Sequence, residues 1–123
     1  MRPSISSGYL STLDAYEMVA FFMEAGFLET EINECHFGPF MRKEKNVKEF
    51  RKYIDDLGFS IPQGHLIFMN AGNITSLDNT YAIDNLKRNL DVFYTLGVKA
   101  TVLHYSNFGS DIVPVEKWFD VRV

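Results

Sequence analysis

The chain has 123 residues, of which 46% are hydrophobic and 23% are charged, values typical of one globular domain with a real core. Its net charge of −4 argues against nucleic acid as the main partner. Cys35 is the single cysteine, which excludes an internal disulfide and fits a reducing cytosol. No apolar run reaches the roughly 18–20 residues of a membrane span, and the N-terminus lacks the apolar core of a signal peptide. We therefore expect a cytoplasmic protein that makes no membrane contact.

The first part of the chain predicts a strand, a helix and a second strand. Residues 2–6 form a short candidate strand. Ser11 and Asp14 are spaced like a capping box and open a helix with apolar residues at helical spacing, which Gly26 ends. Residues 28–35 are expected to form the second strand, although it is less apolar than a buried parallel strand should be.

The middle of the chain predicts another helix and another strand. Asn46 and Glu49 form an N-cap pair at the start of a helix that Gly58 ends. Residues 59–66 read as the third strand. Pro62 lies inside it and removes a backbone donor, which favours a strand start or an irregular strand.

The last part repeats the same alternation. Residues 67–79 are expected to form a loop, and residues 81–96 a helix that Gly97 ends. Residues 99–103 are the fourth predicted strand. Pro114 suits the first turn of a fourth helix, and the sequence ends within that helix at Val123.

This alternation predicts an α/β fold with parallel strands, joined by right-handed crossovers, in a single domain over residues 1–123. The helices end in AGF, LGF and LGV before the next strand. In each case glycine supplies the left-handed residue, and an apolar residue then enters the sheet.

Two histidines, His65 and His104, stand at the carboxyl ends of apolar strands. The carboxyl ends of parallel strands are where α/β folds carry their chemistry. A histidine there can bind a metal or transfer a proton near neutral pH, and two on adjacent strands would lie about 5 Å apart. The alternative is that each is a partly buried histidine bonded to a carbonyl group. Two histidines alone are not a metal-ligand set.

Polar residues in the second predicted strand are further candidates. Glu31 and Asn33 would share one face and Glu34 the other. Glu31 could point into a barrel lumen and bond a substrate hydroxyl, or the strand could be a solvated edge. For Cys35 and His36, we expect a loop histidine beside a buried thiol.

The order of three motifs, FLETEINECHF, LGFSIPQGHL and FYTLGVKATVLHY, resembles the sugar-phosphate isomerase/epimerase family of xylose isomerase-like TIM barrels. This superfamily also includes the apurinic endonucleases. The resemblance covers the whole chain and places it in the N-terminal half of the barrel, with four strands. It implies that His65 and His104 line the substrate pocket or bind metal, and that Glu31 faces the lumen.

The resemblance further implies a carbohydrate substrate and a divalent metal (Mn, Mg, Co or Zn) that assists proton transfer next to a carbonyl group. In the family the metal ligands lie on the last four strands, so we expect the isolated 123-residue chain to be inactive. A half-barrel leaves two open sheet edges. We therefore expect self-association, pairing with a second half-barrel, or closure as a small flavodoxin-like sheet.

Two other functions stay open. The chain could be a non-catalytic α/β module that binds a small polyol or self-associates. It could instead be a metal-dependent endonuclease that acts on abasic DNA. Against the endonuclease stand the acidic charge and the sequence Ile5, Ser6, Ser7, Gly8, which lacks the histidine that this branch has after its first strand.

Overall fold

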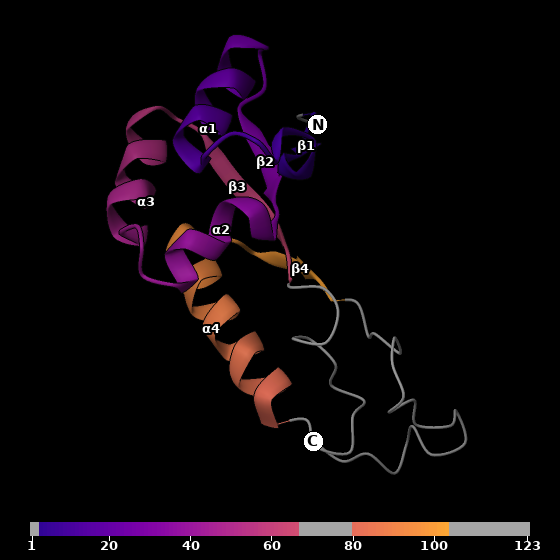
Figure 1. Cartoon of the computed structure of the whole chain (residues 1–123). Coiled ribbons are helices and arrows are strands. Elements are labelled where there is room, and N and C mark those ends of the chain that lie inside the picture. Colours follow the sequence, from indigo (N-terminus) through magenta and orange to yellow (C-terminus); the bar gives the residue numbers. More distant parts are fainter. Residues whose placement is uncertain (1–2, 67–79, 104–123) are drawn as a thin grey trace, which may run out of the picture.

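The computed structural model describes residues 3–66 and 80–103, and these form a parallel sheet with helices packed on it (Figure 1). The elements in chain order are β1 (Ile5–Ser6), the 3-10 helix η1 (Ser7–Leu10), α1 (Ala15–Glu24), β2 (Glu29–Ile32), α2 (Glu34–Met41), α3 (Val47–Asp56), β3 (Ser60–His65), α4 (Thr80–Leu96) and β4 (Ala100–Val102). The predicted α/β class is confirmed. The expected loop over residues 67–79, His104 and the helix from Pro114 fall outside the described residues.

The four strands lie in the sheet in the order β1-β2-β3-β4, and every neighbouring pair is parallel. Ser6 pairs with Glu31, Glu31 with Gln63, and His65 with Val102. A sequential parallel order is that of a barrel segment, whereas a flavodoxin-like sheet reverses its order part-way. The flavodoxin-like arrangement is therefore wrong for these four strands, and half a TIM barrel is compatible with them.

The helix starts follow from side-chain caps. The carboxylate of Asp14 accepts hydrogen bonds from the backbone N–H groups of Tyr16 and Glu17, and Glu17 bonds back to the Asp14 N–H. The capping box of α1 is therefore formed by Asp14 and Glu17, not by Ser11 and Asp14. Asn46 caps α3 as predicted.

The predicted glycine stops are confirmed at all three helix ends. Gly26, Gly58 and Gly97 have φ values of 85°, 69° and 79°, which side-chain-bearing residues rarely adopt. The N–H of the apolar residue after each glycine bonds back to a carbonyl five residues earlier, for example Phe59 to Ile54. This is the Schellman arrangement, and it directs each chain from its helix into the sheet.

One α-helix was not predicted. Residues 34–41 form α2, so the second strand ends at Ile32 and not at Cys35. The segment contains Gly38 and Pro39, which are both weak in helix interiors. Packing stabilises the helix despite this, because Phe37 and Phe40 are buried in the core.

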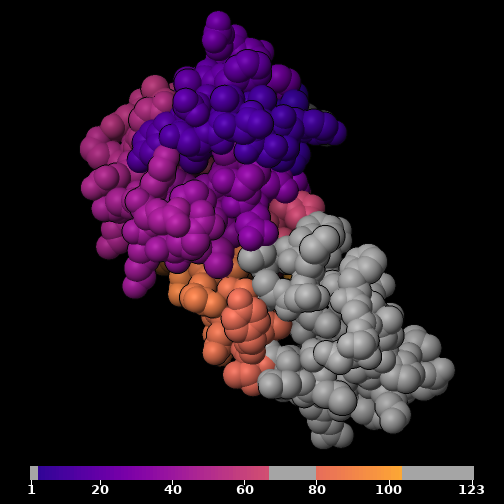
Figure 2. All heavy atoms as spheres, viewed as in Figure 1, coloured from indigo at the N-terminus to yellow at the C-terminus, as the bar shows by residue number. Residues whose placement is uncertain are grey.

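The core contains an aromatic cluster between α2, α3 and α4. The rings of Phe37 and Phe93 pack edge to face with their centroids 4.9 Å apart. The rings of Phe40 and Phe50 are stacked with their centroids also 4.9 Å apart. Figure 2 shows the elements from β1 to α3 as one rounded body with α4 at its lower end. Within the described parts of the chain, no helix is both long enough and apolar enough to cross a membrane.

The strand β3 contains an irregularity that decides which residues reach each face. Two pairing steps on β2, from Glu29 to Glu31, match three steps on β3, from Ser60 to Gln63. This bulge includes Pro62, which confirms the predicted irregular strand. After it, Gly64 is buried, whereas Gln63 and His65 are partly exposed on the other face. The bulge thus reverses the face of the sheet to which the later residues of β3 point.

We predict that Gly64→Ala destabilises the protein by about 1–3 kcal/mol, because overpacking forces a core to shift. A Cβ atom at position 64 would stand 2.5 Å from the Phe93 ring. Gly38→Ala is the control, since the atom nearest to its new Cβ is the far end of Arg42 at 3.0 Å. The control should be neutral or gain up to about 1 kcal/mol of helix propensity. Urea unfolding of both variants checks this, and equal stabilities would contradict the packing argument.

Candidate functional site

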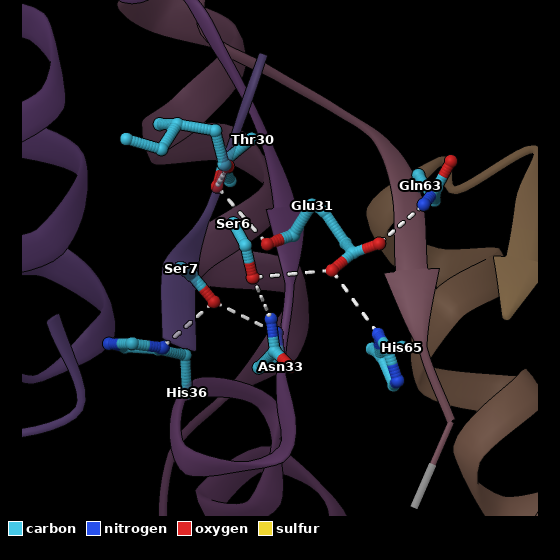
Figure 3. Close-up of polar contacts among 9 residues, drawn as sticks. Ser6, Ser7, Thr30, Glu31, Asn33, His36, Gln63 and His65 are labelled. Atoms are coloured by element: carbon cyan, nitrogen blue, oxygen red, sulfur yellow. Dashed lines mark hydrogen bonds and ion pairs between the residues drawn. The ribbon is translucent and has the colours of Figure 1, made fainter. Parts of the chain in front are cut away.

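The carboxylate of Glu31 stands at the centre of a polar cluster on the partly exposed face of the sheet (Figure 3). Ser6 Oγ donates to Glu31 Oε1 at 3.2 Å, and His65 Nδ1 lies 3.2 Å from the same oxygen. Gln63 Nε2 donates to Glu31 Oε2. Three neighbouring strands, β1, β2 and β3, therefore meet at one carboxylate, near the carboxyl ends where parallel sheets carry their sites.

A pocket of about 370 Å³ opens beside this carboxylate. Residues from all four strands and from the segment before β1 line it: Ser4, Ile5, Ser6, Glu31, Pro62, Gln63 and Ala100. Its volume is in the range of small-molecule sites. His65 lies next to Glu31 without lining the pocket itself.

Glu31 is held in its ionised form. Partial burial by itself raises the pKa of Glu31, but hydrogen bonds from Gln63, His65 and Ser6 and the charge of a protonated His65 together lower it below its usual range. At neutral pH the side chain is therefore a hydrogen-bond acceptor and a weak base.

The contact with Glu31 also fixes the ring of His65. A nitrogen beside a carboxylate is favourable when it carries a proton, so Nδ1 is the donor. In the neutral ring the lone pair then lies on Nε2. The carboxylate thereby selects one tautomer and one orientation of His65.

A second group of polar contacts lies behind the cluster. Asn33 Nδ2 donates to Ser6 Oγ at 2.7 Å, and the Asn33 backbone N–H donates to Ser7 Oγ at 2.8 Å. Ser7 Oγ is 3.0 Å from Nδ1 of His36, whose Nε2 is 3.2 Å from the carbonyl oxygen of Leu10. A carbonyl can only accept, so Nε2 carries the proton and Nδ1 accepts from Ser7.

The structure brings together Glu31 and His65, two of the candidate residues of the sequence. The predicted pairing of His65 with His104 cannot be followed, because His104 lies outside the described residues. Three expectations were wrong. Glu34 is in α2 and not in a strand. His36 is a buried helical residue, 1% exposed, and not a loop histidine. The cysteine beside it, Cys35, is exposed, not buried.

Sequence reasoning missed Ser6 and Gln63 as members of the site. Gln63 stands two positions before His65, and the period-two alternation of a strand places such residues on one face. That spacing was the available signal for Gln63. Nothing in the sequence singles out Ser6, because only the register with Glu31 brings it to the carboxylate.

The metal that the resemblance implies does not fit the described residues. In residues 3–66 and 80–103, no three histidine, cysteine, aspartate or glutamate side chains come together as a metal-ligand set. Both oxygens of Glu31 already accept hydrogen bonds. A divalent metal would therefore need ligands beyond these residues.

Comparison with protein-family models gives no match, and comparison with curated protein sequences gives none either. The geometry of the site is therefore the basis on which its function is inferred.

We predict that the free energy of unfolding falls as the pH drops through about 6.5, the usual pKa of histidine. Burial lowers the pKa of His36 in the folded state. When the pH is below the pKa that His36 has in the unfolded chain, the unfolded chain binds a proton at His36 and the folded protein does not. Acid therefore favours the unfolded state. Urea unfolding between about pH 7.5 and about pH 5.5 measures this, since carboxylates titrate lower.

His36→Gln is the matched variant for this measurement, because it removes the titrating ring and keeps a polar side chain. Its stability should depend less on pH over the same interval. An equal slope in wild type and variant would exclude His36 as the cause.

Proposed function

We propose that this chain is the N-terminal half of a sugar or sugar-phosphate isomerase/epimerase barrel, and that Glu31, Gln63 and Ser6 bind the hydroxyl groups of a carbohydrate. The observation that carries the proposal is the polar cluster around Glu31 on the partly exposed face of a sequentially ordered parallel sheet. The motif order noted in the sequence supports the same family.

The chemistry of the cluster suits a polyol. An ionised carboxylate offers about four acceptor positions, and the bonds from Ser6, Gln63 and His65 leave room for one further donor. A sugar hydroxyl is such a donor. The amide of Gln63 and the hydroxyl of Ser6 each contain both donor and acceptor atoms, which matches the two-sided hydrogen bonding of hydroxyl groups.

In the proposed reaction these residues bind and orient the substrate. His65 is oriented by its contact with Glu31, and with Nδ1 as the donor the acceptor atom of its neutral ring is Nε2. The divalent metal of the family would be bound by residues outside those described, among them His104 and ligands on further strands. A second half-barrel or a second copy of the chain would supply the rest of the barrel and cover β1 and β4.

A non-catalytic polyol-binding module is the second candidate. The lowered pKa of Glu31 is compatible with it, because a carboxylate that holds its proton weakly is a poor base for removing a proton from carbon. Both candidates require that the pocket bind a carbohydrate, and they differ in whether proton transfer follows.

We predict that Glu31→Gln weakens carbohydrate binding by about tenfold or more, since a hydrogen bond to a charged group contributes about 1.5–3 kcal/mol. Calorimetric titration with aldoses, ketoses and their phosphates measures the affinity. Glu29→Gln is the control, because this substitution removes the same charge from the same strand. Glu29 does not line the pocket. Equal losses of carbohydrate affinity in both variants would contradict the assignment of Glu31 to the binding site.

Incubation of the full chain with a bound sugar and a divalent metal in D₂O tests for proton transfer. Deuterium entering the carbon next to the carbonyl group, seen by NMR, supports the isomerase and contradicts the non-catalytic module. Binding without exchange is expected of both candidates for this chain alone, because the metal of the family would need ligands beyond the described residues. If no sugar of the panel binds, both are contradicted.

A further inference from the structure

The side chain of Asn33 is used in an unusual way for its position. Asn33 is the N-cap residue of α2, yet its side chain makes no capping hydrogen bond to that helix. Asparagine at an N-cap normally accepts from the first backbone N–H groups, as Asn46 does in α3. Asn33 instead donates from Nδ2 to Ser6 Oγ at 2.7 Å. The residue gives up local helix stabilisation in favour of a contact with the site.

This contact decides the direction of the Ser6 hydroxyl. A serine hydroxyl has one proton to donate and two lone pairs to accept. Because the Asn33 amide donates to Ser6 Oγ, the hydroxyl accepts on that side and directs its proton to Glu31 Oε1, 3.2 Å away. Figure 3 shows Ser6 between Asn33 and Glu31 in this chain of contacts.

Asn33 is itself held from behind by buried groups. Its backbone N–H donates to Ser7 Oγ at 2.8 Å, and Ser7 is bonded to His36. Ser7 is 0% exposed and His36 is 1% exposed. Buried polar groups with all their partners present rigidify a structure, so the backbone position from which the Asn33 amide reaches Ser6 is held in place.

We propose that Asn33 is a positioning residue of the Glu31 site. It aims the Ser6 proton at the carboxylate, and thereby orients Glu31 and the His65 ring bonded to it. The inference rests on the proposed function only for the kind of ligand, because the hydrogen-bond geometry is measurable in the ligand-free protein.

The test is Asn33→Asp, which keeps the size of the side chain and replaces its donor by an acceptor. The aspartate accepts the Ser6 proton, so the bond from Ser6 to Glu31 is lost. Aspartate is also as good an N-cap as asparagine, and its charge is favourable at a helix N-terminus, so the fold should persist. At a fixed neutral pH we expect NMR shifts of the Glu31 carboxyl carbon and of the His65 ring nitrogens, with no loss of thermal stability.

Asn46→Asp is the matched control, because it makes the same chemical change at the N-cap of α3, which does not contact Glu31. It should leave the Glu31 and His65 signals in place. Unchanged signals in Asn33→Asp would overturn the proposal. If Asn33→Asp unfolds, Asn33→Ala replaces it, and the proposal then requires a smaller shift of the same two residues.

The Ser6→Ala background separates action through Ser6 from the effect of a new nearby charge. If Asn33 acts through the serine hydroxyl, Asn33→Asp shifts the Glu31 and His65 signals less in Ser6→Ala than in the wild-type chain. Equal shifts in both backgrounds would show an effect through space and overturn the inference. A chain that binds no sugar but shows this coupling would contradict the proposed function alone.

Discussion

The contact between Gly64 of β3 and the Phe93 ring of α4 is the constraint on which the site depends. Phe93 lies against the backbone of β3 where a side chain would otherwise stand. Because successive residues of a strand face opposite ways, a buried Gly64 requires Gln63 and His65 to face the other side of the sheet. The packing of one aromatic ring thus presents two site residues to Glu31. The bulge at Pro62 makes this compatible with a buried Ile61.

On the opposite face, a single carboxylate connects three strands. The position of Glu31 between β1 and β3 follows from the strand order, and its charge is stabilised by donors from both neighbours. The same donors make it a weak base, so its chemistry is that of a hydrogen-bond acceptor that orients other groups. This is the reason why the proposal assigns Glu31 to binding and leaves proton transfer to other groups.

Much of the fold was predictable from local signals. The stops at Gly26, Gly58 and Gly97 depend on backbone freedom within a few residues, and the cap at Asn46 depends on its own helix. The helix α2 was not predictable in this way. Its Gly38 and Pro39 disfavour a helix locally, and burial of Phe37 and Phe40 against α3 and α4 outweighs that preference. Such burial depends on residues far away in the chain.

The sequence by itself determined the α/β class, the parallel strands, the presence of Glu31 in the second strand and that of His65 at the end of the third, because periodicity, caps and glycine stops are local properties. Only the tertiary structure decided which residues meet. Strict alternation along β3 would place Ile61, Gln63 and His65 on one face, and the bulge separates Ile61 from the other two. Ser6 joins the site through its register with Glu31, and Asn33 turns from its own helix to Ser6. These contacts could not be predicted from the sequence, because each joins segments that are distant along the chain.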